Sequence, residues 1–171
     1  MAQVVRFYST RDAFGCFSNF SKHPVTARGA LFPTSEHYFQ AMKFIDSKAD
    51  WEAVLASKTA MMAAKIGRDR TRKLRKDWDQ VKDSVMFEVC LAKFTQNKDI
   101  RQVLLSTGAA TLVEHTRNDA YWGDGGDGSG KNMLGKTLMR VRETLACETA
   151  DKTLHVEVPS KKRPRPFTEV L

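Results

Sequence analysis

Apolar residues recur at steps of three and four along much of this chain, and this periodicity constrains its fold more than any other feature. In residues 77–95, the stripe consists of Trp78, Val81, Val85, Val89 and Ala92. Residues at this spacing lie on one face of an α-helix, which is buried against other elements. The pattern therefore predicts a long amphipathic helix over residues 77–95.

The rest of the chain predicts more helices and few strands. We expect helices over residues 35–45, 50–58, 59–66, 99–108 and 134–145. Thr34 is expected to cap the first of these, Gly67 to end the third and Asp99 to cap the fourth. Alternating apolar and polar residues predict strands over 4–9, 111–116 and 153–158. Since no strand-helix unit repeats, we expect a helix-rich α+β fold in a single compact domain.

Length, cysteine content and charge narrow the class of protein. A chain of 171 residues can bury a core without disulfides or metals, and three cysteines with no CxxC spacing favour reduced thiols in an intracellular, cytoplasmic setting. No apolar run approaches the roughly 18 residues of a membrane span, so no membrane partner is expected. The net charge of +8 favours a polyanionic partner, such as DNA or RNA, or a phosphate-bearing substrate.

The C-terminal residues differ in composition from the rest. We expect the domain to occupy residues 1–150, followed over residues 151–171 by a short edge segment and a basic tail. The tail contains KKRPRP, and its prolines and like charges predict disorder. This run is consistent with nuclear import or contact with RNA.

A glycine-rich segment from Asn118 to Lys136 carries the strongest chemical signal. Glycine lets the backbone approach a ligand closely and present N–H groups to anions. The segment adds carboxylates, aromatic rings, a cation and an amide, which suit a phosphorylated ribose bearing a base: Asp119, Asp124, Tyr121, Trp122, Lys131 and Asn132. The alternative is a surface turn that its tryptophan anchors to the core. The residues after Asp124 lack the alternating oxygen ligands of a calcium loop, so we expect no metal site.

The helix that follows Pro33 carries a second signal. Glu36, Gln40 and Lys43 are spaced by four and three and therefore share one face. Among aromatic neighbours, burial would raise the pKa of Glu36, whereas the helix N-terminus would favour its charge. Such a carboxylate can act as a base or stabilise a developing cation. The alternative is a first-turn glutamate that only complements the helix dipole, while the other two side chains face water.

Seven segments occur in order between Phe7 and Leu145: FYSTRDAFGCFSNF, FPTSEHYFQAMKF, AAKIGRDR, LRKDWDQVKDSVM, KFTQNKDIRQVLLSTG, LVEHTRNDAYWGDGGDGSGKNMLGK and LMRVRETL. In this order they resemble the NADAR family, the NAD- and ADP-ribose-associated superfamily that includes the N-glycosidase acting on riboflavin-pathway intermediates. Residues after Ala146 lie outside the resemblance. The resemblance also implies the helix-rich α+β fold of that family.

The resemblance implies a hydrolase that cleaves the bond between ribose C1 and a nitrogen. The functional positions of the family fall on Glu36, Trp78 and Asp119. Because such a bond breaks through an oxocarbenium-like sugar, we expect Glu36 to orient water or stabilise the cation. Asp119 is expected to bind ribose hydroxyls or to assist the same step. Hydrolysis by carboxylates requires no cofactor, and none is expected.

Further substrate contacts are expected from the same blocks. Trp78 is expected to stack on the base or ribose, although its position also suits a core anchor; the other stacking candidates are Phe20, Tyr121 and Trp122. Phosphate contacts are expected from Arg11, Lys43, Lys131 and Asn132. Completing the expected site are Phe14, Asn19, Asn118, Gly123 and Asp124. For Phe14 and Asn19, a hydrophobic plug formed by their loop is an equal alternative.

Three activities remain open from the sequence. The first is removal of ADP-ribose from guanine in nucleic acid or nucleotides, which the positive charge favours and which would make binding salt-dependent. The second is cleavage of ribosylated 5-amino-pyrimidine intermediates of riboflavin biosynthesis, which needs no extended basic surface. The third is a module that binds ADP-ribose or an NAD derivative without chemistry.

Overall fold

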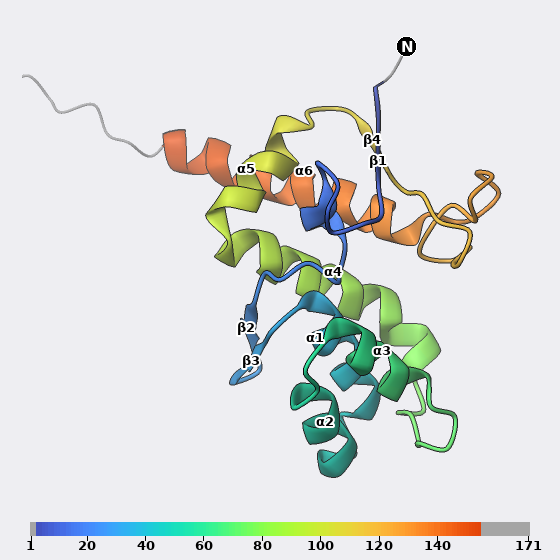
Figure 1. The fold of residues 1–171 in the computed structure, drawn as a ribbon. Helices are drawn as coiled ribbons and strands as arrows, with labels where there is room; N and C mark the ends of the chain where they lie inside the picture. The colour runs from blue at the N-terminus through green and yellow to red at the C-terminus, as the bar shows by residue number, and fades with distance from the viewer. Residues whose placement is uncertain (1–2, 155–171) are drawn as a thin grey trace, which may run out of the picture.

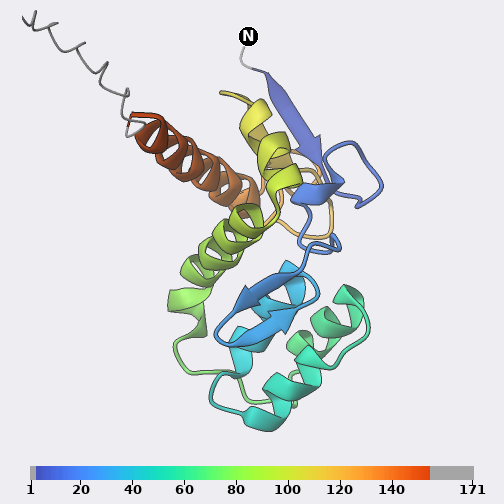
Figure 2. The same cartoon turned by 90° about the vertical axis from the view of Figure 1, so that its left-hand side faces the viewer.

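The computed structural model describes residues 3–154 and the side chains of residues 3–148. The long helix α4 (Trp78–Gln96) crosses the middle of the molecule, with one group of elements on each side of it (Figures 1 and 2). We call these groups the upper part and the lower part, as they stand in Figure 1. The apolar stripe predicted on α4 is confirmed, since Val85 and Val89 are buried and Trp78 and Val81 pack against the core.

The upper part contains a small parallel sheet and two helices. Its elements are β1 (Val4–Phe7), α5 (Lys98–Ser106), β4 (Thr111–Glu114) and α6 (Met133–Leu154). In the sheet, Val5 pairs with Leu112 and Phe7 with Glu114. Helix α6 packs on β4 and on α4. A short 3-10 helix, η1 (Gly15–Phe17), follows β1 in the connection to the lower part.

The lower part begins with an antiparallel hairpin and continues as helices. Its elements are β2 (Val25–Ala27), β3 (Ala30–Phe32), α1 (Ser35–Ala41), the 3-10 helix η2 (Met42–Phe44), α2 (Lys48–Leu55) and α3 (Ala60–Arg68). Thr34 caps α1 as predicted, because its Oγ1 accepts the N–H of His37 at 3.3 Å. The helix-rich α+β class is therefore confirmed.

Several element boundaries differ from the prediction. Helix α2 begins at Lys48, where Ser47 supplies the N-cap. Asp99 does not cap α5 but lies in its first turn. Residues 153 and 154 belong to α6 instead of opening a strand, while the rest of that expected strand and the basic tail lie outside the described residues. No helix within residues 3–154 is long and apolar enough to cross a membrane.

Gly67 does not end α3, which continues to Arg68. A Cβ atom at position 67 would lie 1.7 Å from Oε1 of Gln40 on α1. Such a distance is far inside van der Waals contact, so any other residue at position 67 would force the buried Gln40 side chain to move. The glycine therefore serves the packing of α1 on α3 and not the end of the helix.

Lys93 is the buried cation that joins α4 to the segment after η1. Its side chain is fully buried, and its Nζ donates to the carbonyl oxygens of Cys16 at 2.5 Å and Ser18 at 3.0 Å and to Oγ of Ser21 at 2.7 Å. Burial lowers the pKa of Lys93 to about 8. Three oxygen acceptors compensate for the desolvation of the ammonium group, so the segment 16–21 is fixed to the helix.

Replacing Lys93 by Met is expected to lower the free energy of unfolding by about 2–4 kcal/mol, because it keeps most of the volume but leaves buried acceptors without a donor. The measurement is urea denaturation monitored by circular dichroism. The control is Lys98→Met at an exposed position in the first turn of α5, expected to change stability by less than about 0.5 kcal/mol. Equal midpoints for the two variants would contradict the role assigned to Lys93.

Candidate functional site

A cavity of about 970 Å³ is bordered by residues from both parts of the molecule. Its wall combines residues 8–10 after β1, residues 18–22, helix α1, residues 58–61 at the start of α3, and residues from 114 to 122. The cavity brings together these predicted site residues: Phe20, Asn19, Glu36, Lys43, Asn118, Asp119 and Trp122. Both predicted catalytic carboxylates therefore lie at one cavity.

Glu36 lies in the first turn of α1 and is 6% exposed. Burial raises its pKa, whereas a hydrogen bond from Gln40 and the positive charges of Lys43 and Arg68 oppose this shift. The Gln40 bond joins Nε2 to Oε1 of Glu36 at 2.7 Å. Glu36 is thus a desolvated carboxyl group whose ionised form has a donor and two cations to support it.

Asn19 connects Glu36 to the segment that Lys93 holds. The backbone N–H of Glu36 donates to the carbonyl oxygen of Asn19 at 3.1 Å. The side chain of Asn19 is buried at the cavity, where its Nδ2 donates to Sδ of Met86 at 3.1 Å and its Oδ1 has no hydrogen-bond partner. A buried acceptor without a partner is costly, so this amide is suited to meet a ligand.

The rest of the polar stripe does not face water either: Gln40 on α1 is buried, and Lys43 in η2 is half-buried. Lys43 donates from Nζ to the carbonyl oxygen of Gly67 at 3.0 Å, and burial lowers its pKa. The same Nζ lies 5.7 Å from the ring centroid of Phe39 and 5.6 Å from that of Trp78. His37 is 1% exposed and fills a structural position, since its two ring nitrogens contact Thr34 Oγ1 and the carbonyl oxygen of Ser57.

Asp119 is fixed by its own loop. Its Oδ1 accepts the backbone N–H groups of Tyr121 and Trp122, each at 2.8 Å. No described residue donates a hydrogen bond to its Oδ2. The carboxylate is therefore anchored by one oxygen, and the other is available to a ligand. Among the side chains of residues 3–148, no three His, Cys, Asp or Glu form a group that could hold a metal ion.

A third carboxyl group, Glu114, lines the cavity from the end of β4. Burial, together with the negative charges of Asp119, Glu36 and Asp124, raises its pKa to about 7. Glu114 was not among the site residues expected from the sequence, because the alternating pattern of residues 111–116 indicates only an outward polar position for it. Its place at the carboxyl end of a strand, directly before the glycine-rich loop, is the signal that would have found it.

Other residues predicted in the loop hold its backbone and do not line the cavity. Asn132 donates from Nδ2 to the carbonyl oxygen of Leu112 at 2.8 Å and accepts the N–H of Glu114 at 3.0 Å. A Cβ atom at Gly123 would lie 2.6 Å from Cγ2 of Thr116, so this glycine permits close packing. These residues shape the loop, which is not a loose turn.

Asp124 has a similar role. It is 7% exposed, and its carboxylate accepts from the backbone N–H groups of Thr116 and Gly126 and contacts Nδ1 of His115 at 2.7 Å. Burial alone would raise the pKa of Asp124, but these hydrogen bonds outweigh it and the pKa is lowered. The carboxylate of Asp124 is therefore engaged in hydrogen bonds that hold the loop.

The predicted aromatic contacts divide between the cavity and the core. Trp78 is not part of the cavity lining; its ring lies 5.0 Å from that of Phe39, which lines the cavity and also lies 5.4 Å from Trp122. Phe14 packs 5.5 Å from Phe17 against the core, which fits the alternative of a hydrophobic plug. Trp78 therefore supports the cavity wall from behind.

The remaining predicted contacts lie outside the lining. Tyr121 donates from its hydroxyl to Asp83 at 2.8 Å, and Nζ of Lys131 lies 5.1 Å from the Tyr121 ring. Arg11 and Lys131 are exposed. The cations that do line the cavity, besides Lys43, are Lys22, Lys58 and Arg68. None of these three was among the individual phosphate contacts expected from the sequence.

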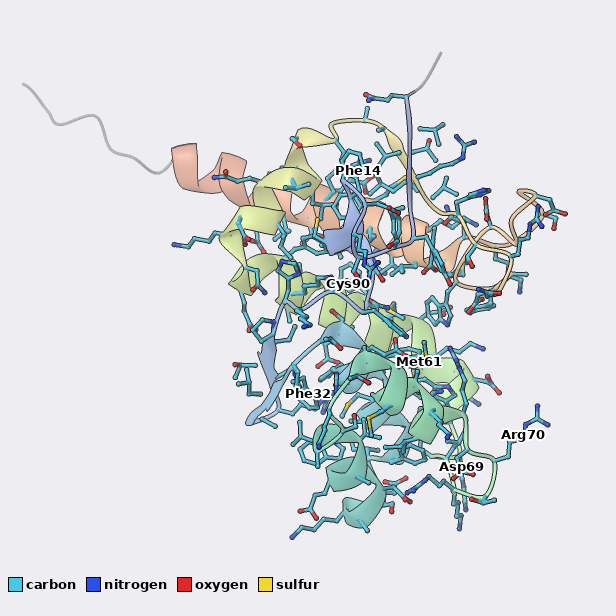
Figure 3. The ribbon with its side chains drawn as sticks, viewed as in Figure 1. Phe14, Phe32, Met61, Asp69, Arg70 and Cys90 are labelled. Carbon is cyan, nitrogen blue, oxygen red and sulfur yellow. The ribbon has the colours of Figure 1, made fainter. Side chains whose placement is uncertain are left out.

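A second cavity of about 690 Å³ adjoins the first. Its lining consists of Met61, Lys65, Ile66, Arg68, Asp69 and Arg72. Met61 and Arg68 belong to both cavities. Figure 3 places Met61 on α3 and shows Arg70, in the loop after that helix, extending away from the molecule. The cationic side chains between Lys58 and Arg72 are thus split between cavity-lining and outward-facing positions.

Comparisons with known proteins agree with this architecture. The family model described as the NADAR domain matches residues 6–146. N-glycosidase YbiA of Escherichia coli (strain K12) is 53% identical over 145 residues, covering 85% of this chain and 90% of that protein. N-glycosidase Npun_R5314 of Nostoc punctiforme is 47% identical over 144 residues, covering 83% and 92% of the two chains.

A third relative and a solved structure extend the comparison. The riboflavin biosynthesis protein VVA0006 of Vibrio vulnificus is 40% identical over 164 residues, which cover 96% of this chain and 44% of that protein. The NMR structure of the E. coli protein YbiA superimposes with a TM-score of 0.81 at 49% identity and covers 94% of each chain. By its sequence over residues 6–146 and by its fold, this chain belongs to the NADAR domain family.

Proposed function

We propose that this protein is an N-glycosidase that hydrolyses the bond between C1 of a phosphorylated ribose and the nitrogen of a base. The observation that carries the proposal is the convergence of Glu36 on α1 with Glu114 and Asp119, from the stretch that ends β4 and enters the glycine-rich loop, on one cavity. The same cavity presents aromatic rings and cations, and its size of about 970 Å³ is that of a small-molecule site. Relatives named N-glycosidase, at 53% and 47% identity, support the reaction class.

The chemistry requires a negative group beside the sugar. As the C1–N bond breaks, positive charge develops on C1 and the ring oxygen. Glu36, with its ionised form favoured by Gln40, Lys43 and Arg68, stabilises this charge and accepts a proton from the attacking water. Asp119 uses its Oδ2 to bind ribose hydroxyls, because its Oδ1 is held by the loop.

The other lining residues match the remaining groups of such a substrate. Phe20, Phe39 and Trp122 offer ring faces for a base, and Trp78 keeps Phe39 in place. Asn19 offers its Oδ1 acceptor to a base amino group. The phosphate is bound by cations at the cavity: Lys22, Lys43, Lys58 and Arg68.

Two substrates of this class are supported by different observations. Ribosylated 5-amino-pyrimidines of riboflavin biosynthesis are favoured by the relative from Vibrio vulnificus, which is named a riboflavin biosynthesis protein. ADP-ribosyl-guanine, free or in DNA or RNA, is favoured by the second cavity, where Lys65 provides charge for a second phosphate beyond the shared residues Met61 and Arg68. Arg72 in the same lining is already paired with Asp50 and Asp69. We place ADP-ribosyl-guanine first, because it would use both cavities.

Glu36→Gln is expected to lower kcat by about 10²–10⁴-fold while substrate binding changes little, since the amide keeps the size but not the charge. Release of free base, followed by mass spectrometry, gives the rate, and titration calorimetry gives the affinity. Glu88→Gln, an exposed glutamate of α4 that pairs with Arg28, is the matched control and should behave as wild type. Near-normal turnover of the Glu36 variant would defeat the assignment.

The substrate order is tested at the second cavity. Lys65→Gln is expected to raise KM about tenfold for ADP-ribosyl-guanine and to leave the ribosyl 5-phosphate of a 5-amino-pyrimidine unaffected, because only the larger substrate reaches Lys65. Lys73→Gln, in the exposed loop after α3 and outside both cavity linings, is the control. An equal change of KM for both substrates would contradict ADP-ribosyl-guanine as the preferred substrate.

Binding of ADP-ribose without release of base from either substrate would instead indicate a module that only binds.

A further inference from the structure

Building on the proposed N-glycosidase reaction, we propose that Glu114 is a second catalytic residue, the general acid that protonates the nitrogen as it leaves ribose C1. No role was assigned to this residue by its sequence pattern. Its carboxyl group lines the same cavity as Glu36 but comes from the opposite part of the molecule, since Glu36 lies on α1 and Glu114 at the end of β4. A sugar bound between them would have one carboxyl group on each side.

The backbone of Glu114 is held rigidly. Its N–H donates to Oδ1 of Asn132 at 3.0 Å, and its carbonyl oxygen accepts the N–H of Asp124 at 2.9 Å. It also pairs with Phe7 in the parallel sheet. The described residues give its carboxyl group no hydrogen bond or ion pair. An acid on a fixed strand end, with its side chain left unpartnered at a cavity, is well placed to meet a substrate atom.

The two glutamates, Glu36 and Glu114, differ in the charge of the groups that surround them. Burial raises the pKa of Glu36, and the charge of Asp119 adds to this, but a hydrogen bond from Gln40 and the cations Lys43 and Arg68 favour its ionised form. The charged groups that act on Glu114 are the carboxylates Asp119, Glu36 and Asp124, which favour its protonated form and, with burial, raise its pKa to about 7. Paired carboxyl groups in contrasting surroundings divide into a base and an acid. Cys90 also lies near Glu114, but its own pKa is raised by burial to about 12, so it stays neutral.

Other proton donors at the cavity are less suitable. Both ring nitrogens of His37 are occupied by Thr34 and Ser57. Asp119 receives two backbone N–H groups on one oxygen, which hold it in the loop. Glu36 accepts a hydrogen bond from Gln40. Glu114 is therefore the carboxyl group at the cavity that accepts no hydrogen bond from a described residue.

The C1–N bond breaks, its electron pair goes to nitrogen, and the proton of Glu114 forms the new N–H bond. The oxygen of a water molecule bonds to C1, and one of its protons passes to Glu36. The products are the free base and the ribose with a hydroxyl group at C1. Exchange with solvent then returns a proton to Glu114 and removes one from Glu36, so no further reactant is needed.

The test compares Glu114→Gln with Glu36→Gln on two substrates that share ribose 5-phosphate. One carries an amino-linked pyrimidine or guanine base, and the other carries p-nitrophenolate, which leaves without protonation. Glu114→Gln is expected to lower kcat about 10²–10⁴-fold on the base substrate and less than about threefold on the nitrophenyl substrate. Glu36→Gln is expected to be impaired on both substrates, and Glu88→Gln on neither.

The pH profile supplies an independent readout. Because the acid must be protonated, wild-type base release is expected to fall about tenfold per pH unit above about 7, and this limb should be absent in Glu114→Gln. Glu114→Asp keeps an acid and should retain the limb at a lower kcat. Calorimetric binding of ribose 5-phosphate and thermal melting show that each variant is folded.

The outcomes separate the two proposals. Normal base release by a folded Glu114→Gln variant, or equal losses on both substrates, would reject Glu114 as the acid while the N-glycosidase reaction stands. If wild-type protein released no base and no nitrophenolate, the reaction itself would be rejected, and the role of Glu114 with it.

Discussion

The buried ammonium group of Lys93 is the interaction on which the arrangement of the site depends. It binds oxygens of Cys16, Ser18 and Ser21 and so fixes the segment after η1 to the central helix. That segment contains Asn19, whose carbonyl oxygen receives the N–H of Glu36. Lys93, which is not part of the cavity lining, thus helps to fix the position of Glu36, the proposed catalytic carboxyl group, by two successive hydrogen-bonding steps.

In the glycine-rich loop, some polar side chains hold the backbone and another faces the cavity, and the sequence alone does not distinguish these two roles. Asp124 and Asn132 have side chains typical of ligand contacts, yet both are saturated by backbone groups of the loop and β4. Asp119 is only half saturated and faces the cavity. The difference arises from which backbone N–H groups fold back onto each carboxylate or amide, and composition carries no information about that.

Periodicity predicted the helices because the burial of an apolar stripe is a local property of the sequence. The hairpin of β2 and β3 was missed, since each strand has three residues, too few for an alternating pattern. The resemblance to the family placed Glu36 and Asp119, which the structure brings to one cavity. Glu114 and the cation Arg68 were missed because their importance depends on contacts between segments far apart in the chain. Gly67 was predicted to end a helix, but its role depends on the neighbouring helix α1, because the Gln40 side chain occupies the space that a side chain at position 67 would need.

The contact between Gln40 and Gly67 links the acidity of the site to the spacing of two helices. Gln40 fills the space that any other residue at position 67 would need, and the same side chain donates to Glu36. A ligand that pushed α3 away from α1 would loosen this amide and weaken its support for the negative charge. The proton affinity of Glu36 therefore depends on the distance between α1 and α3.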